Sequence, residues 1–335
     1  MIKAAFCDDD DTVLKELQSL LEEYRRERDY RIDAKIYHSP LDLLNEMEKG
    51  TRFDILFLDI LMPGVDGIQT ASEIRKFDNN IKIIFLTSSV EFAVQSYEVK
   101  AYYYQLKPIE KGSFYHLLDS VLEQMDKEHE RNQRIIDTAF RLFVEKKIEA
   151  VSMDEVAKEA GVGRATLFRC YNNKTELAIA VCASKWKAYL DKLDEARPIS
   201  SIHDIPAIGR FIFTLDSYIG MYQNHKDLLQ YNDNFNNYIT HQTVRQEELA
   251  NFHASLNSVN TRLHMMYAKA KEDKTFRTDI PEEQFMRVTV HTMMAACTHY
   301  AGGFIWGATD NKDYTGDLLL LKEMILNYAR NDANL

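Results

Sequence analysis

The sequence predicts an α/β domain built on an open parallel sheet of five strands, followed by a larger part that is almost entirely helical. Over roughly the first 125 residues, short apolar runs alternate with segments whose apolar residues recur at helical spacing. Beyond that point the strand pattern nearly disappears and helical periodicity continues to the end. Strands that alternate with helices favour a doubly wound sheet, whose ligand site lies at the carboxyl ends of the strands.

Each expected strand is short and apolar, and a helical pattern follows it. The first pair is Ile2–Cys7, which ends in acids, and Thr12–Arg26, which places its leucines on one helical face. The other strands are expected at Ala34–Tyr37, Phe53–Leu58, Ile81–Leu86 and Tyr102–Leu106. The other helices are expected at Pro40–Lys49, Ile68–Lys76, Phe92–Val99 and Ser113–Gln124.

The junction between the two parts is highly charged. Residues 123–134 contain neither Pro nor Gly. A flexible hinge and a helix that runs on into the next part both fit this composition. We favour the continuous helix, because nothing in the segment interrupts it.

Length and composition limit the classes of protein. A chain of 335 residues is long enough for two or three domains, each with its own core. No window has 18 uninterrupted apolar residues, and the start has one Lys followed by four acids, unlike a secretory signal. We therefore expect a cytoplasmic protein with no membrane span. The four cysteines lack CxxC spacing and indicate reduced thiols rather than disulfides or a zinc site.

The net charge of −11 argues against a nucleic-acid partner only if it is spread evenly. Residues 1–128 carry a net charge of −9, residues 129–187 carry +3, and residues 188–335 carry −5. A basic segment between two acidic ones favours domains with different partners. Chance fluctuation in a short window explains the same charges equally well.

Polar side chains stand at the ends of four predicted strands. Asp8 and Asp9 follow the first, Asp59 the third and Lys107 the fifth, while Thr87 follows the fourth. In a doubly wound sheet these ends converge on one rim. Carboxylates at close range repel one another and need a counter-charge, which Mg²⁺ and an ammonium supply. A carboxylate beside such cations is well placed to attack a phosphoryl group, although any one acid alone is more simply a solvated turn residue or a helix cap.

Residues 1–125 resemble a response-regulator receiver domain, which has a flavodoxin-like fold. Four motifs carry the resemblance: FCDDD (6–10), DILFLDILMPGVDG (54–67), FLTSS (85–89) and YYYQLKP (102–108). Their style is closer to receivers that usually precede LytTR-type DNA-binding domains. No β-rich segment of that type follows in this chain.

The receiver resemblance implies a role for each residue of the rim. Asp59 would be the phosphoacceptor for a sensor histidine kinase, and Lys107 would pair with the phosphoryl group. A Mg²⁺ site would be formed by Asp8, Asp9, Asp59 and the backbone carbonyl of Leu61. Thr87 and Tyr104 would be the switch residues, although Tyr104 is equally a half-buried strand aromatic. A cis peptide bond would precede Pro108.

Residues 131–187 are predicted to form three helices and the start of a fourth. Ser152 caps one of them as part of a capping box with Glu155, and Gly161 ends it. A short helix over about 164–170 follows after a tight turn. Two short helices joined in this way form a helix-turn-helix, whose second helix can enter the major groove. An ordinary helical hairpin with surface arginines fits the spacing equally well.

The segment RIIDTAFRLFVEKKIEAVSMDEVAKEAGVGRATLFRCYNNKTELA (134–178) resembles the DNA-binding domain of TetR-family regulators over its whole length. The resemblance implies eight positions that face DNA bases or phosphates: Ser152, Gly163, Arg164, Thr166, Phe168, Arg169, Tyr171 and Lys174.

Four positions depart from the usual TetR pattern. Phe168 replaces a frequent Tyr, Cys170 a frequent His and Gly163 a frequent Ser. Lys147 stands where Gly usually ends the first helix. A left-handed backbone at that lysine would cost roughly 1 kcal/mol.

The last part of the chain is expected to be a helical bundle. Its apolar-periodic stretches are Ile205–Leu229, Asn232–Ala270, Pro281–Ala301 and Thr315–Ala329. The dense aromatic and polar residues of YNDNFNNY (231–238) fit a ligand pocket or, more simply, core aromatics. By the TetR resemblance this part binds a small-molecule effector, and helices over Pro281–Ile305 and Thr315–Arg330 form a homodimer. A two-fold dimer implies a roughly palindromic operator.

Together these patterns predict a receiver domain over 1–125, a TetR-like helix-turn-helix domain over 126–186 and an effector-binding and dimerisation domain over 187–335. We expect a transcription regulator rather than an enzyme, with phosphorylation of Asp59 altering operator binding. The alternative is a small-molecule-responsive TetR-type repressor whose receiver is an interaction or dimerisation platform. A Mg²⁺-dependent phosphohydrolase is a weaker third hypothesis, because it leaves the helix-turn-helix without a role.

Overall fold

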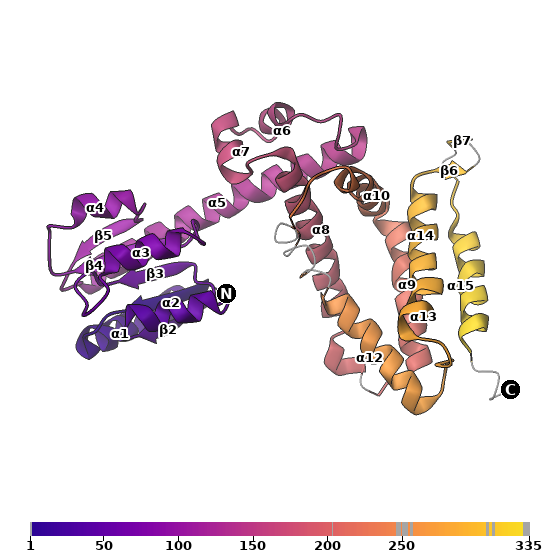
Figure 1. Cartoon of the computed structure of the whole chain (residues 1–335), viewed down its shortest axis with the longest axis horizontal. Helices are drawn as coiled ribbons and strands as arrows, with labels where there is room; N and C mark the ends of the chain where they lie inside the picture. Colours follow the sequence, from indigo (N-terminus) through magenta and orange to yellow (C-terminus); the bar gives the residue numbers. More distant parts are fainter. Residues whose placement is uncertain are drawn as a thin grey trace. The chain divides into compact units, whose positions relative to one another are not determined.

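The computed structural model describes residues 2–202, 204–245, 249, 254, 257–305, 308–309 and 312–330. The chain divides into two compact units, Met1–Glu128 and His129–Leu335. Helix α5, Lys111–Lys146, is continuous across the division (Figure 1). This confirms the helix that the absence of Pro and Gly predicts for residues 123–134.

The first unit is built on a parallel sheet with the strand order β2-β1-β3-β4-β5. This confirms the predicted doubly wound sheet of five strands. All four residues of β3 are buried, as expected for a parallel strand covered on both faces. The strands are β1 (Ile2–Cys7), β2 (Ile32–Tyr37), β3 (Ile55–Leu58), β4 (Lys82–Thr87) and β5 (Tyr103–Leu106).

Helices cover both faces of this sheet. One apolar core lies between the sheet and helices α1 and α5, and a second lies on the face covered by α2 and α3. The remaining helices of the unit are α1 (Asp11–Arg28), α2 (Pro40–Glu48), α3 (Gly67–Arg75) and α4 (Ala93–Glu98).

The backbone at the carboxyl ends of the strands is tightly packed. The N–H of Asp59 donates to the carbonyl of Cys7 at 2.9 Å, which places the end of β3 beside the end of β1. Helix α3 begins at Gly67, where an added Cβ would lie only 2.1 Å from the carbonyl oxygen of Asp59. Only glycine therefore allows α3 to start against the Asp59 backbone.

The second unit is helical apart from one short antiparallel pair, β6 (Phe304–Ile305) with β7 (Ala308–Thr309). A single apolar core runs through its described residues, from the helix-turn-helix to the last helix. After α5 its helices are α6 (Met153–Glu159), α7 (Arg164–Cys170), α8 (Lys174–Ala196), α9 (Ala207–Asn224), α10 (Lys226–Thr240), α12 (Asn257–Asp273), α13 (Glu282–Val288), α14 (Val290–Ala301) and α15 (Thr315–Ala329).

The single helix expected over Pro281–Ile305 is wrong. It is broken at Thr289, whose φ of −118° and ψ of −77° separate α13 from α14. Thr289 lies between two valines, and β-branched residues are stiff and weaken a helix. The second segment ends at Ala301 because two glycines follow, and Gly303 takes a φ of +71°.

The other two long stretches also differ from single helices. Ile205–Leu229 is divided at His225, which separates α9 from α10. Asn232–Ala270 corresponds to the end of α10 and most of α12, and residues 246–248, 250–253 and 255–256 between them lie outside the described residues.

Lys147 ends α5 in the left-handed region, with a φ of +66°. Replacement by Gly removes the clash of its Cβ with the backbone and should raise the free energy of unfolding of the second unit by roughly 1 kcal/mol. Urea denaturation followed by circular dichroism measures this change. Lys147→Ala is the matched control: it keeps the Cβ, so an equal gain from Ala would contradict the explanation.

Candidate functional site: an acidic pocket and a helix-turn-helix

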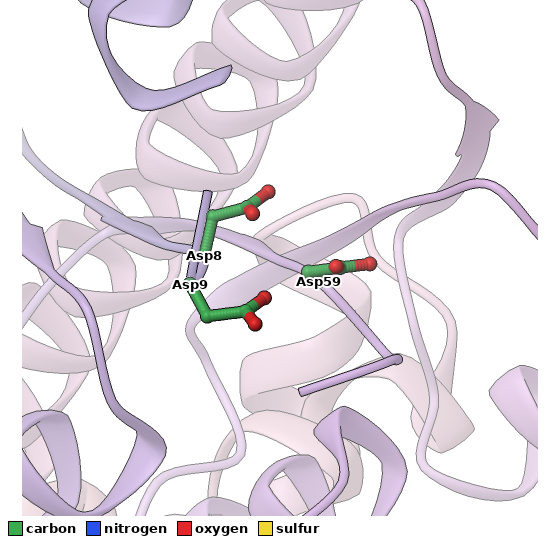
Figure 2. A group of neighbouring side chains, drawn as sticks. All are labelled: Asp8, Asp9 and Asp59. Atoms are coloured by element: carbon green, nitrogen blue, oxygen red, sulfur yellow. The ribbon is translucent and has the colours of Figure 1, made fainter. Parts of the chain in front are cut away.

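Three carboxylates meet at the carboxyl end of the sheet. Asp8 and Asp9 follow β1 and Asp59 follows β3, and each offers an oxygen within 4.8 Å of the others. Figure 2 shows the three side chains extending toward the same side. Asp8 and Asp59 are buried, with exposed fractions of 2% and 5%, whereas Asp9 is exposed. The sequence therefore predicts the grouping of these three residues correctly.

Lys107 supplies the counter-charge. Its Nζ lies 2.7 Å from Asp8 and 2.9 Å from Asp59. Burial raises the pKa of Asp8 even though Lys107 and the N–H of Asp10 oppose the shift. Burial also works against the charge on Lys107, but its hydrogen bonds to Asp8 and Asp59 outweigh this and raise the pKa of the ammonium. One cation faces three carboxylates, so the pocket has room electrostatically for a divalent ion.

The donor set fits Mg²⁺. Asp8, Asp9 and Asp59 offer only oxygen, which is the ligand that Mg²⁺ prefers. Leu61 lies two residues beyond Asp59, and no described residue donates a hydrogen bond to its carbonyl, which is thus available as a further ligand. Receiver domains conventionally bind Mg²⁺ at an acidic pocket of this kind.

The two residues expected to act as switches are linked through Ser89. The hydroxyl oxygen of Thr87 accepts from the N–H of Ser89 at 3.4 Å, and the hydroxyl of Tyr104 donates to the carbonyl of Ser89 at 2.6 Å. Thr87 is fully buried and Tyr104 is half-buried. The peptide bond that precedes Pro108 is cis, as the resemblance implies.

The sequence reasoning missed two contributors to this rim. Ser89 belongs to the motif FLTSS, but neither its type nor its spacing indicates that it joins Thr87 to Tyr104. Gly67 follows Asp66, which caps α3 by accepting from the N–H of Gln69 at 2.7 Å. An Asp-Gly pair before a helical pattern is a recognisable start signal, so the role of Gly67 was open to prediction.

The second candidate site is the pair α6 and α7. Ser152 caps α6 by accepting from the N–H of Glu155 at 3.1 Å, and Gly161 ends the helix region with a φ of +65°. Gly163 precedes α7 and provides no side-chain cap. Leu167 is fully buried beneath α7. These features confirm the two short helices and the turn that the sequence predicts.

The predicted DNA-facing residues differ in exposure. Arg164, Arg169, Gly163 and Ser152 are exposed. Arg164 pairs with Asp154 at 3.1 Å, and its guanidinium lies 5.5 Å from the centre of the Phe168 ring. A further group is half-buried: Thr166, Phe168, Tyr171 and Lys174. Burial raises the pKa of Tyr171 to about 12, so its phenol stays protonated.

Lys174 faces the backbone rather than solvent alone. Its Nζ donates to the carbonyl of Glu149 at 2.9 Å and to that of Val151 at 3.0 Å. Burial lowers the pKa of this ammonium. Two of its three donors thus hold the loop before α6, so we expect Lys174 to position the helix-turn-helix more than to bind phosphate.

Residues 5–119 match the family model of the response regulator receiver domain, and residues 135–181 match that of bacterial regulatory proteins of the tetR family. The chain is a receiver domain fused to a TetR-type domain. This confirms both resemblances. The two domains together indicate a response-regulator-like transcription regulator.

The receiver accounts for the similarity to curated proteins. The chain is 31% identical over 135 residues to the sensory transduction protein LytT of Bacillus anthracis, which covers 40% of this chain and 53% of that protein. It is 32% identical over 84 residues to the transcriptional regulatory protein YpdB of Escherichia coli, covering 22% and 34%. The chain thus spans between a third and about half of the length of the relatives it matches.

One similar solved structure is the response regulatory domain of MrkE from Klebsiella pneumoniae. It is 25% identical, covers 38% of this chain and 99% of that chain, and has a TM-score of 0.35. Within the described residues, no helix of the receiver or of the TetR-type domain combines the length and apolarity needed to cross a membrane.

The helical part beyond the TetR-type helix-turn-helix contains a cavity of about 220 Å³. Residues of α8, α9, α10, α12 and α14 line it, among them Trp186, Tyr218 and Asn232. The Nε1–H of Trp186 donates to Asn232 at 3.2 Å. Part of the segment YNDNFNNY therefore does face a cavity, while Tyr231 and Phe235 are core aromatics.

Mg²⁺ should stabilise the receiver. At a concentration one hundred times its Kd, binding adds about 2.7 kcal/mol to the free energy of unfolding. Because burial raises the pKa of Asp8, protons compete with the metal above the ordinary pH range of a carboxyl group, and affinity should fall as the pH is lowered. Thermal unfolding across Mg²⁺ and pH series measures both effects.

Two variants test where that Mg²⁺ binds. Asp9→Asn should remove most of the Mg²⁺-dependent gain, whereas Asp33→Asn, an exposed acid on β2, should retain it. Equal responses of the two variants would place the metal elsewhere.

Lys174 and Arg169 should have separable roles in the TetR-type domain. Lys174→Met removes two hydrogen bonds from a charged donor and should lower the free energy of unfolding by roughly 1.5 kcal/mol. Arg169→Met should leave stability unchanged but reduce the salt dependence of DNA binding by about 0.9 per phosphate contact. Denaturant titrations and DNA affinities over a salt series distinguish the two. A lower salt slope for Lys174→Met at unchanged stability would refute the positioning role.

Proposed function

We propose that the protein is a two-component transcription regulator in which a sensor histidine kinase phosphorylates Asp59 and thereby changes operator binding by the TetR-type helix-turn-helix. One observation carries the proposal. A buried carboxylate, two neighbouring acids and an ammonium at 2.9 Å share a rim with a buried hydroxyl, in the same chain as a helix-turn-helix.

The proposed chemistry is phosphoryl transfer to a carboxylate. The P–N bond of the kinase phosphohistidine breaks as an oxygen of Asp59 forms the new P–O bond, and the imidazole is the leaving group. Lys107 would pair with a phosphoryl oxygen, since its ammonium already lies 2.9 Å from Asp59. Mg²⁺ held by Asp8, Asp9, Asp59 and the Leu61 carbonyl would offset charge on the transferred oxygens.

The response of the fold would begin at Thr87. Its hydroxyl accepts from the N–H of Ser89, and Tyr104 donates to the carbonyl of the same residue. If Thr87 reaches a phosphoryl oxygen, its bond to Ser89 changes and Tyr104 loses or shifts its acceptor. Because β5 leads into α5, and α5 belongs to both units, this helix is the physical route to the TetR-type domain.

The DNA-binding form would be a homodimer on a roughly palindromic operator. Helix α15 exposes apolar side chains one turn apart, Leu320 at 59% and Met324 at 62%. Leu319 and Tyr328 extend this exposed apolar strip. A second copy of the same strip would bury it, and the resulting two-fold axis would relate two DNA-reading heads.

Within each head, α7 would enter the major groove. Arg164, Thr166, Phe168 and Arg169 lie on α7, and Gly163 stands at its start. Ser152 and Tyr171 flank the pair of helices and would contact phosphates, while the third donor of Lys174 would add a weaker contact.

A second candidate function is a repressor that responds to a small molecule, with the receiver as an interaction platform. The cavity among α8, α9 and α12 favours it, because a hollow with mostly apolar walls and a few polar groups is the usual form of a ligand site. The two functions are compatible in one chain.

Phosphorylation should change the Kd for operator DNA by roughly 5- to 150-fold, the usual range of coupling between two sites. Operator fragments are first selected from random duplexes, and affinities are then measured by fluorescence anisotropy with Mg²⁺, with and without beryllofluoride as the phosphoryl analogue. Asp59→Asn should abolish the change, and Asp33→Asn should retain it. An unchanged Kd in the wild type, or an undiminished response in Asp59→Asn, would refute the proposal.

A further inference from the structure

We infer that the cavity among α8, α9 and α12 binds an amphipathic carboxylate, with its apolar body inside and its acid group on Arg197. The inference rests on the second candidate function proposed above and names the chemical class of its ligand. It follows from the composition of the walls, from their charge and from the way in which Arg197 is held.

The walls of the cavity are largely apolar. Leu190 and Leu193 come from α8, Phe213 and Met221 from α9, and Leu263 and Met266 from α12. Figure 1 shows α8, α9 and α12 arranged around one side of the helical part. A volume of about 220 Å³ with such walls suits the hydrocarbon body of a small molecule.

The charge of the walls is one-sided. Three arginines line the cavity, Arg197, Arg210 and Arg262, and no Asp or Glu is among the described residues that line it. Asp194, which lies outside the lining, offsets only Arg262, at 2.6 and 2.9 Å. A hollow lined by one sign of charge between apolar walls attracts a ligand of the opposite sign.

Arg197 is held in place and keeps its donors available. Its guanidinium lies 4.1 Å from the centre of the Phe213 ring, and its backbone carbonyl accepts from Arg262 at 2.6 Å. Among the described residues it forms no ion pair with an acid. A guanidinium stacked on a ring still presents its N–H groups at the edge, where a planar carboxylate can accept two of them.

Arg262 connects this end of the cavity to α8. It bonds both Asp194 and the carbonyl of Arg197, so it fixes the last turn of α8 against α12. We therefore assign Arg262 a positioning role and Arg197 the contact with the ligand. Aliphatic and aromatic carboxylates share the required chemistry, and the experiment distinguishes them.

Fluorescence of Trp186 tests the inference, because this residue lines the cavity and the chain has only two tryptophans. The full chain with Trp306→Phe is titrated with decanoate and with 4-butylbenzoate, each against its neutral alcohol, decanol or 4-butylbenzyl alcohol. At least one acid should change the emission saturably, with a Kd at least about tenfold below that of its alcohol. Which acid binds more tightly tells whether the body is aliphatic or aromatic.

Arg197→Gln should raise the Kd of that acid by about tenfold or more and leave the Kd of the alcohol within about twofold. The matched control is Arg287→Gln, an exposed arginine on α13 that pairs with Glu283, and it should retain acid binding. Absence of binding by both acids, equal affinity for acid and alcohol, or an unchanged preference in Arg197→Gln would overturn the inference. DNA binding and its response to beryllofluoride are measured on the same variants, so a failure of the proposed regulator function is seen separately.

Discussion

The ammonium of Lys107 is the interaction on which the receiver rim depends. It lies between two buried carboxylates, 2.7 Å from Asp8 and 2.9 Å from Asp59. Without it, neighbouring buried acids would repel one another, and one would take up a proton. The N–H of Lys107 also donates to the carbonyl of Thr87 at 2.9 Å, so the residue that balances the charge ties β5 to β4. Tyr104 lies three residues earlier on the same strand. Charge balance and the proposed switch therefore share one strand.

The sequence was sufficient for most of the receiver because its strands are short, apolar and followed by distinctive polar residues. Parallel topology then brings Asp8, Asp59 and Lys107 to one rim without further information. The continuous α5 was equally predictable, since helix breakers are absent from its charged segment. The link through Ser89 was not, because a backbone N–H and carbonyl carry no signal in residue type.

In the helical part, periodicity predicted that helices exist but not where they break. The β-branched run at Thr289 and the glycines after Ala301 are local signals that a long apolar period conceals. Side-chain direction was harder still. Lys174 has the residue type of a phosphate contact, yet two backbone carbonyls occupy its ammonium. The cavity likewise depends on the packing of five helices distant in sequence, which no local pattern reports.

Helix α10 gives the TetR-type part a direct connection between its cavity and its helix-turn-helix. Asn232 accepts from Trp186 at the cavity, and six residues further along, at about 1.5 Å of rise each, Tyr238 shares a hydrogen bond with Thr175 at 2.9 Å. The ring of Tyr238 also lies 5.8 Å from the ammonium of Lys174, which holds the carbonyls before α6. A helix is stiff along its axis, so a displacement at Asn232 is carried to the residues that position α6 and α7. Because these contacts lie within one continuous apolar core, a ligand in the cavity and the orientation of the helix-turn-helix cannot vary independently.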